Sequence, residues 1–311
     1  MLHPRAFKVT VVWTLLLLLL GSVVHATESS LACPDWPTCF GTMVPEMSGG
    51  VFWEHLHRLV AGGLLLMFSL ATWLAHKEAG DRPWVMKACW GGIALLLVQS
   101  AFGGLTVVYR LPDLVSTTHL ALAFSFLALA TVLAAATSTP HEAASNDGAP
   151  GTAVVPTNSG TALGAASAAG LVFAQSVLGG LVRHMDAGMA CPDAPLCLGQ
   201  IVPPLINAPI IAHFSHRVLA LVAALAVLAL AARILRSDSP PSVRLWATLA
   251  AVLVLVQVAL GVASVLTVLA VAPVSLHTLV AAGLLASLVY LATVSSPARD
   301  RTSPAAAATA A

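Results

Sequence analysis

Hydrophobic residues fall into eight long runs that shorter polar stretches separate. Each run holds roughly 20 mainly apolar residues, the length with which an α-helix crosses about 30 Å of hydrocarbon. The pattern therefore predicts an all-α membrane protein with eight transmembrane helices. Because eight is an even number, both termini are expected on one side of the membrane. The runs are centred near Leu17, Leu65, Leu96, Phe126, Val172, Val222, Leu253 and Leu284.

Composition and charge refine this picture. Hydrophobic residues make up 58% of the 311 residues and charged residues 9%, which is too apolar for one soluble core. The net charge of +1 gives no reason to expect a nucleic-acid partner, and membrane lipid is the expected surrounding. The positive-inside bias places the termini in the cytoplasm. We expect a multi-pass protein of the plasma membrane. Ten basic residues fall in the termini and in the loops after even-numbered helices, against four on the opposite face: Arg5, Lys8, Lys77, Arg82, Lys87, Arg233, Arg236, Arg244, Arg299 and Arg301, against Arg58, Arg110, Arg183 and Arg217.

An internal repeat organises the chain. Residues 21–41 align without a gap on residues 179–199, an offset of 179 − 21 = 158. At the same offset, Gln99 meets Gln257 and His119 meets His277. One further residue brings the segment Glu54 to Arg58 onto the segment His213 to Arg217. Because each repeat holds an even number of helices, we expect two tandem parallel-repeat four-helix bundles, related by an axis along the membrane normal.

The repeat also sets the expected domain boundaries. We predict an N-terminal four-helix half over residues 1–136 and a C-terminal four-helix half over residues 161–293. Residues 137–160, rich in Pro, Gly, Ser and Asn, are interpreted as a flexible cytoplasmic linker, and residues 294–311 as a cytoplasmic tail. The first run, preceded by Arg5 and Lys8, also fits a cleavable signal peptide. Its full-length counterpart inside the chain argues against cleavage.

Four histidines occupy repeat-matched positions in the predicted helices. His57 and His119 lie a few residues into the second and fourth helices, which both enter from the outer face, so their rings are expected at similar depth. His216 and His277 repeat this arrangement. Paired imidazoles across a bundle suit two axial ligands of a haem iron, whereas a single membrane histidine often only bonds a neighbouring helix. Six further histidines are interpreted as solvated or packing residues: His3, His25, His55, His76, His141 and His184.

Glu54 precedes His57 by three residues, so both side chains are expected on one helix face. An intramembrane carboxylate is a functional candidate, and the alternative is an interfacial glutamate in contact with water. His213 stands at the equivalent place in the second half. We therefore expect two sites that are built alike but equipped differently, one to react and one to bind or relay electrons.

Three arginines are candidate anchors for porphyrin propionates. Arg58 and Arg217 each follow a proposed ligand histidine and are turned about 100° from it, where their planar fork suits a carboxylate. Snorkelling of the side chain to the headgroups is the alternative. Arg183 with Asp186 is interpreted either as a propionate anchor or as a pair that orders the loop.

Two cysteine pairs lie in the first and third outer loops, each in a Cys-Pro-Asp-x-Pro-x-Cys frame. On the oxidising side of a membrane, this predicts one disulfide between Cys33 and Cys39 and another between Cys191 and Cys197. A metal site that uses all four cysteines is the rival, although Cys-x-x-Cys spacing is missing.

Together these motifs resemble the haem A synthase family, whose members convert haem O to haem A for cytochrome oxidase. The resemblance covers nearly the whole chain. It is carried by Glu54-His-Leu-His57-Arg58, His119, Gly180-Leu-Val-Arg183, the two Cys-Pro-Asp loops, His216-Arg217 and His277.

The resemblance implies that substrate haem O binds between His57 and His119, and that haem b is held as a cofactor between His216 and His277. It implies oxidation of a porphyrin methyl group to a formyl group by successive hydroxylation. Glu54 would be the catalytic carboxylate, either as a proton acceptor or as a stabiliser of positive charge. Implied partners are a haem O synthase, the cytochrome oxidase assembly machinery and an electron acceptor of unknown identity.

Two features depart from the expected pattern. His25 stands at the first-half position that matches Arg183, where another arginine is expected. Both loops carry a cysteine pair, which only part of the family has, so a redox role for Cys33 and Cys39 is a hypothesis.

Two other functions compete with this interpretation. The histidine pairs alone would also suit a non-enzymatic dihaem membrane cytochrome, but such a carrier has no need of Glu54 in one half only. A haem transporter is the third candidate, which the lack of a second charged residue in mid-span disfavours. Gln99, Gln175 and Gln257 are interpreted as contacts between helices rather than as a polar route.

Overall fold

The computed structural model describes residues 1–78, 82–138 and 159–296, and within these ranges it contains eight long α-helices and one 3-10 helix. All eight long helices are long and apolar enough to cross a membrane, which confirms the predicted all-α, eight-span architecture. They are α1 (His3–Ala26), α2 (Gly49–Glu78), α3 (Pro83–Val108), α4 (Asp113–Ser138), α5 (Ser159–His184), α6 (Ala208–Leu235), α7 (Pro241–Leu266) and α8 (Val271–Ser295), with η1 (Ala187–Met189) between α5 and α6.

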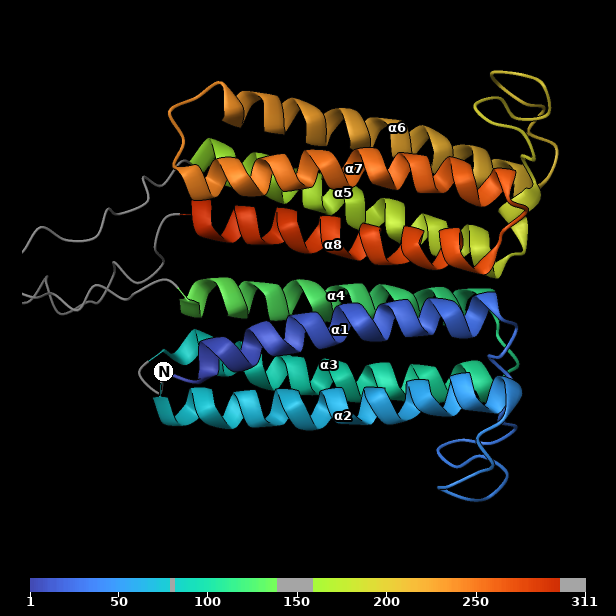
Figure 1. The fold of residues 1–311 in the computed structure, drawn as a ribbon, viewed down its shortest axis with the longest axis horizontal. Coiled ribbons are helices and arrows are strands. Elements are labelled where there is room, and N and C mark those ends of the chain that lie inside the picture. Colours follow the sequence, from blue (N-terminus) through green and yellow to red (C-terminus); the bar gives the residue numbers. More distant parts are fainter. Residues whose placement is uncertain (79–81, 139–158, 297–311) are drawn as a thin grey trace, which may run out of the picture.

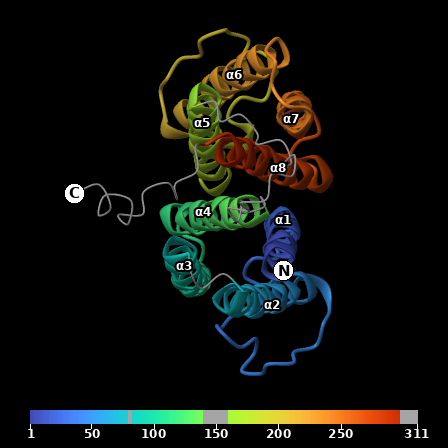
Figure 2. The same ribbon diagram turned by 90° about the vertical axis from the view of Figure 1, so that its left-hand side faces the viewer.

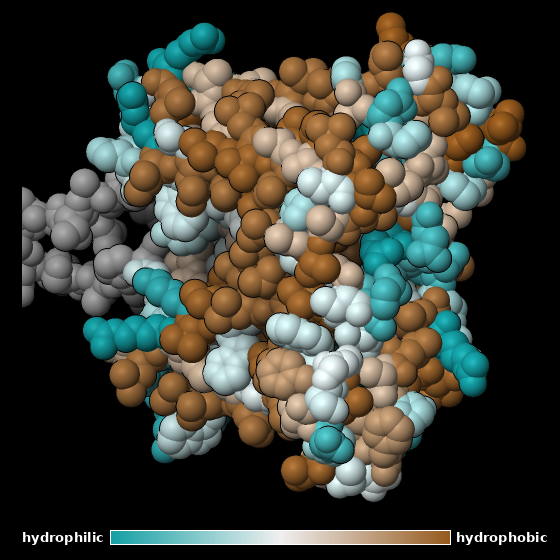
Figure 3. Space-filling model, turned by 45° about the vertical axis from the view of Figure 1, so that its right-hand side comes forward, coloured by the Kyte–Doolittle hydropathy of each residue, from teal (hydrophilic) through white to brown (hydrophobic). Residues whose placement is uncertain are grey.

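The helices run side by side in two groups of four, α1–α4 and α5–α8 (Figure 1). The long connections after α1 and α5 lie at one end of the molecule, and the N-terminus and the end of α8 lie at the other. In each group, neighbouring helices contact one another around a ring, α1–α2–α3–α4–α1 and α5–α6–α7–α8–α5 (Figure 2). Hydrophobic side chains cover most of the surface seen in Figure 3, and hydrophilic side chains gather toward the two ends.

Local sequence explains where the helices begin and end. Four of them have a proline at the first or second helical position, where no backbone N–H is needed. The Asn207 side chain caps α6 by accepting from the Ile210 backbone N–H at 3.0 Å. The chain leaves α1 and α5 through left-handed residues at repeat-matched positions, Glu28 with φ 54° and Asp186 with φ 51°.

The two groups meet through α1 and α4 on one side and α5 and α8 on the other. Ser22 Oγ of α1 lies 3.1 Å from Thr278 Oγ1 of α8. At the positions that match in the repeat, Gly180 of α5 lies against Leu120 of α4, so closely that an added Cβ would be 2.5 Å from Leu120 Cδ2. The two contacts thus follow the register of the sequence repeat, while the predicted symmetry axis itself stays a prediction.

Buried apolar side chains fill the part of each group nearer the N-terminus. In the first group, the Phe7, Phe68 and Phe126 rings pack together, with centroids 6.2 and 5.1 Å apart. Leu288 and Leu291 of α8 are fully buried in the second group. This packing leaves the other end of each group for the polar residues of the candidate sites.

The predicted domain boundaries stay predictions. Helix α4 extends to Ser138, two residues into the predicted linker, and α8 ends at Ser295. Most of the predicted linker and tail, including His141, Arg299 and Arg301, lies outside the described residues.

Candidate functional site

The four candidate ligand histidines lie on helices at opposite corners of their rings. His57 is eight residues after Gly49, the first residue of α2, and His216 is eight residues after Ala208, the first residue of α6. His119 and His277 both lie six residues after the first residue of α4 and α8. At 1.5 Å per residue these are depths of about 12 and 9 Å. Counted from the helix starts, the two histidines of each pair differ by about 3 Å in depth, and the two pairs repeat the same spacing.

Contacts of the His119 ring define which nitrogen is available to a metal. Nδ1 of His119 lies 3.0 Å from the backbone carbonyl oxygen of Gln99, to which only an N–H can donate. Nε2 then carries the lone pair, and the Gln99 side-chain amide approaches it at 3.3 Å. A backbone carbonyl that fixes the tautomer in this way is the usual support of a metal-binding imidazole. In the second group, the Gln257 amide lies 3.2 Å from Nε2 of His277.

The two groups differ at His57 and His216. The Gln175 side-chain amide of α5 lies 2.9 Å from Nδ1 of His216 and donates to the His216 carbonyl oxygen at 2.9 Å. The first-half position that matches Gln175 is Leu17, since 175 − 17 = 158. Nδ1 of His57 is buried and has no hydrogen-bond partner among the described residues.

These residues fit haem better than other metal centres. Nδ1 of His57 and of His277, and the Oε1 atoms of all three glutamines, are buried without partners, which is the sign of a polar site built for a further group. Among the described residues, no three His, Cys, Asp or Glu side chains come together to hold a metal ion. A pair of imidazoles on opposite helices is a donor set for an iron whose other ligands come from a porphyrin.

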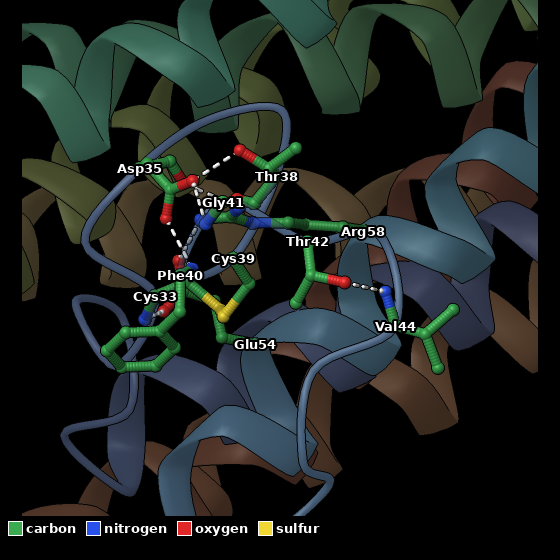
Figure 4. The surroundings of a disulfide bond; sticks show 10 residues. All are labelled: Cys33, Asp35, Thr38, Cys39, Phe40, Gly41, Thr42, Val44, Glu54 and Arg58. Carbon is green, nitrogen blue, oxygen red and sulfur yellow. Dashed lines mark hydrogen bonds and ion pairs between the residues drawn. A yellow bond between two sulfur atoms is a disulfide. The ribbon is translucent and has the colours of Figure 1, made fainter.

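Glu54 is buried, so it does not make the water contact that the alternative interpretation required. Its Oε1 pairs with Arg58 Nη2 at 2.6 Å, and its Oε2 accepts from the Cys33 backbone N–H at 2.7 Å. Figure 4 shows Glu54 beneath the disulfide of the loop between α1 and α2. The carboxylate, one turn before His57, therefore joins α2 to the loop.

His213 occupies the corresponding place in α6 but makes different contacts. It is buried, and its Nδ1 lies 2.9 Å from the Ala187 carbonyl oxygen. Arg217 Nη2 donates to the Cys191 carbonyl oxygen at 2.6 Å, whereas Arg58 Nη2 donates to Glu54. The second site therefore has no carboxylate at this position.

Both arginines hold the long loops that follow α1 and α5. Arg58 Nη1 donates to the carbonyl oxygens of Asp35 and Thr38, at 2.8 and 2.6 Å. Arg217 Nη1 donates to those of Asp193 and Leu196, at 2.7 and 2.5 Å. A guanidinium can bridge two carbonyls in this way because its donors form a planar fork. Pairing of Arg58 and Arg217 with propionates stays a prediction, and the loop contacts are a role that sequence reasoning missed.

Each loop is closed by a cysteine pair and an aspartate. Cys33 and Cys39 have an S–S distance of 2.05 Å, and Cys191 and Cys197 one of 2.00 Å. This intraloop pairing contradicts the rival metal site built from all four cysteines.

The Asp35 carboxylate accepts from the Thr38 hydroxyl and from the backbone N–H groups of Phe40 and Gly41 (Figure 4). These hydrogen bonds, above all those from Thr38 and Gly41, hold the pKa of Asp35 below its ordinary value. Hydrogen bonds from the Gly199 and Leu198 backbone lower the pKa of Asp193 in the same way.

Arg183 lies where the two groups meet. Its Nη2 donates to the His25 carbonyl oxygen at 3.2 Å, and its Nη1 is 3.7 Å from Asp186 Oδ1. The His25 and His184 rings have centroids 5.1 Å apart, and Thr117 Oγ1 is 3.0 Å from Nδ1 of His184. His25 therefore packs against the second group at the position where an arginine was expected. A propionate role for Arg183 stays a prediction.

The remaining histidines fit the interpretation as packing or solvated residues. His3 is buried and pairs with Glu78 through Nδ1 at 2.8 Å, and His55 is buried. His76 is exposed.

The sequence matches the model of the COX15-CtaA family, described as cytochrome oxidase assembly protein, over residues 5–50 and 46–289. The chain belongs to this family. It is 31% identical to a haem A synthase of Symbiobacterium thermophilum, over 91% of this chain and 92% of that protein. A haem A synthase of Halalkalibacterium halodurans is 29% identical over 91% of this chain and 93% of its own length, and that of Shewanella oneidensis is 28% identical over 83% and 86%.

Proposed function

We propose that the chain is a haem A synthase, which oxidises a methyl group of haem O to a formyl group. In this proposal haem O binds between His57 and His119, and haem b stays between His216 and His277. The observation that carries it is the combination of two matched histidine pairs with a buried carboxylate, Glu54, beside only one of them. Family membership and the full-length similarity to haem A synthases support it.

The chemistry oxidises a methyl carbon that is attached to the porphyrin ring. Conversion of a methyl to a formyl group by successive hydroxylation is a four-electron oxidation that also adds one oxygen atom, so both an oxidant and a source of oxygen outside the chain are required. A haem held by His216 and His277 would supply a centre that takes up one electron at a time.

Glu54 is the residue that distinguishes the reacting site. Its charge is held in place by Arg58 and by the Cys33 backbone N–H, so the carboxylate is oriented before substrate arrives. A fixed carboxylate in apolar surroundings can accept a proton from the methyl carbon or stabilise positive charge on it. The second site, with His213 in its place, holds its haem without this function.

Partners and location follow from the same proposal. A haem O synthase would deliver the substrate, and the cytochrome oxidase assembly machinery would receive the product. The location proposed is the plasma membrane, and the distribution of basic residues favours an orientation with both termini in the cytoplasm.

The test is haem extraction and chromatography from membranes in which the chain is expressed with a source of haem O. We expect haem A from the wild type, and only haem O or a hydroxylated intermediate from Glu54→Ala, a loss of roughly 100-fold or more. Glu54→Gln, which retains an oxygen acceptor for Arg58, separates loss of charge from loss of structure. If haem b alone appears in both the wild type and Glu54→Ala, with a low-spin spectrum, the protein is a dihaem electron carrier instead.

A further inference from the structure

A glycine of the neighbouring helix lies against each of the four candidate ligand histidines. A Cβ added to the glycine would lie closer to Cε1 of the imidazole than nine in ten real Cβ contacts, and for Gly179 the ring or the backbone would have to shift. The distances from the added Cβ to Cε1 are 3.0 Å for Gly21 and His57, 3.0 Å for Gly103 and His119, 2.7 Å for Gly179 and His216, and 3.1 Å for Gly261 and His277.

The four glycines follow the register of the repeat. Gly179 matches Gly21 and Gly261 matches Gly103, since 179 − 21 = 158 and 261 − 103 = 158. In both groups the odd-numbered helices supply the glycine and the even-numbered helices supply the histidine. Four such contacts in one register indicate a common design rather than incidental packing.

The point of contact makes the glycines relevant to metal binding. Cε1 is bonded to both ring nitrogens, so a neighbour of Cε1 restrains the direction of the Nε2 lone pair. Because glycine has no Cβ, the ring edge rests directly against the helix backbone. In α3, Gly103 is four residues after Gln99, whose carbonyl oxygen receives the Nδ1–H of His119. One turn of α3 therefore contacts two sides of that imidazole.

We propose that Gly21, Gly103, Gly179 and Gly261 are positioning residues, each forming a notch that sets the plane and tilt of one haem-ligating imidazole. The inference rests on the proposed haem ligation by the four histidines. A methyl group in the notch moves the ring by a few tenths of an ångström, away from the direction that the iron requires.

The consequence differs between the empty and the loaded protein. Without a bond to iron, an imidazole is the far end of a flexible side chain and can swing away from an added methyl group. With that bond, the ring cannot move without tilting or weakening the bond. Alanine in a notch should therefore alter haem binding and its spectrum while the protein still folds.

The experiment compares Gly179→Ala with Gly170→Ala in the purified protein. Both glycines lie in α5, and a Cβ at Gly170 would meet nothing within 4 Å. We expect haem b retention roughly 10-fold weaker for Gly179→Ala, the scale of changes to residues that support metal ligands. Its low-spin electron paramagnetic resonance signal should also shift, because the signal reports the orientation of the axial imidazoles. Gly170→Ala should match the wild type in both measurements.

Gly21→Ala and Gly103→Ala provide an internal control for folding. Both should weaken binding of added haem O, while the haem b signal of the second group stays unchanged. Gly62→Ala and Gly91→Ala, again with nothing within 4 Å of the added Cβ, are the matched controls in the first group. If Gly179→Ala yields no folded protein, Gly261→Ala, with the longest of the four contacts, decides the matter by the same measurements.

The outcomes separate this inference from the proposed function. If Gly179→Ala and Gly261→Ala both keep wild-type haem retention and an unchanged spectrum, while His277→Ala loses haem b, the notches have no positioning role and the ligand assignment stands. If His216→Ala and His277→Ala both retain haem b with its normal spectrum, the ligand assignment fails, and this inference fails with it.

Discussion

The first and second groups of helices share one scaffold but differ at three positions around their histidine pairs. The first has Leu17, His25 and Glu54 where the second has Gln175, Arg183 and His213. In the second group, the Gln175 amide contacts His216, and the hydrogen bonds of the Arg217 guanidinium all go to carbonyl oxygens of the loop. In the first, His57 lacks such an amide, and Arg58 divides its donors between the loop and Glu54.

In the proposed function, this difference would allow one architecture to hold a cofactor haem in one half and to act on a substrate haem in the other. A cofactor site gains from every contact that holds its ligand histidine, as Gln175 does. A substrate site has to bind and release, and it needs a group that acts on the substrate, as Glu54 can. The two roles would then differ through the neighbouring side chains and not through the placement of the histidines, since matched histidines lie the same number of residues from the start of their helices.

The largest expected effect comes from replacing the candidate ligand histidines of either group. His277→Ala should remove haem b from the purified protein, a fall of roughly 100-fold or more, because an axial ligand is lost. His119→Ala should keep haem b but form no haem A. Haem content and extracted haem type measure both effects, and added imidazole should restore part of each loss. Equal loss of haem b in the two variants would contradict separate sites.

A smaller effect is expected from the cysteine pairs. Replacing both cysteines of either loop by serine removes a short cross-link that stabilises by about 2 kcal/mol. Only the double variant Cys33→Ser with Cys39→Ser also weakens the hydrogen bond from the backbone N–H of residue 33 to Glu54. Such a hydrogen bond contributes about 1–1.5 kcal/mol. Haem A formation should then fall about 10-fold.

The matched control is Cys191→Ser with Cys197→Ser, which leaves the contacts of Glu54 intact. Haem A formation is measured for both double variants at equal protein content. Unchanged haem A formation in the first would exclude any role for that pair, redox or structural. An equal fall in both would show that Glu54 is not the link.

The smallest effect concerns the acid dependence of the loops. The folded pKa values of Asp35 and Asp193 lie below the ordinary value of 3.8. Their contribution to loop stability is therefore complete above pH 3.8 and lost as pH falls through the lowered pKa. Asp35 has an additional donor, the Thr38 hydroxyl, where the second loop has Leu196. The first loop should therefore stay ordered to lower pH.

Hydrogen exchange of the Phe40, Gly41, Leu198 and Gly199 amides measures this order, after correction for intrinsic rates. Asp35→Asn should remove the acid dependence in the first loop and leave that of the second unchanged. An identical acid profile in wild type and Asp35→Asn would show that the carboxylate does not hold the loop.

The sequence was sufficient to predict the helices and the register of the histidines. A span of 20 apolar residues has few alternatives in a membrane, and the repeat sets the relative depth of His57, His119, His216 and His277. Contacts that depend on the path of a loop were not predictable. Arg58 and Arg217 appeared free to reach a propionate, because sequence cannot show that loop carbonyls lie within reach of their donors.

The glycine notches were missed for a different reason. Gly21 and Gly179 open the aligned repeat segments, yet a glycine in a membrane helix usually indicates only close helix packing. The signal was present in the spacing of Gln99 and Gly103, and of Gln257 and Gly261, four residues apart on one helix face. Recognising it requires the position of the ring on the next helix.

In the proposed function, the repeat-matched spacing of the two histidine pairs puts the two haem sites at equal depth, which has an energetic consequence. A charge that crosses the whole membrane exchanges about 2.3 kcal/mol with each 100 mV of membrane potential. An electron that passes between two sites at one depth travels along the membrane plane instead, and it does no electrical work against that potential. Exchange of electrons between the two halves should therefore be equally favourable in energised and in de-energised cells.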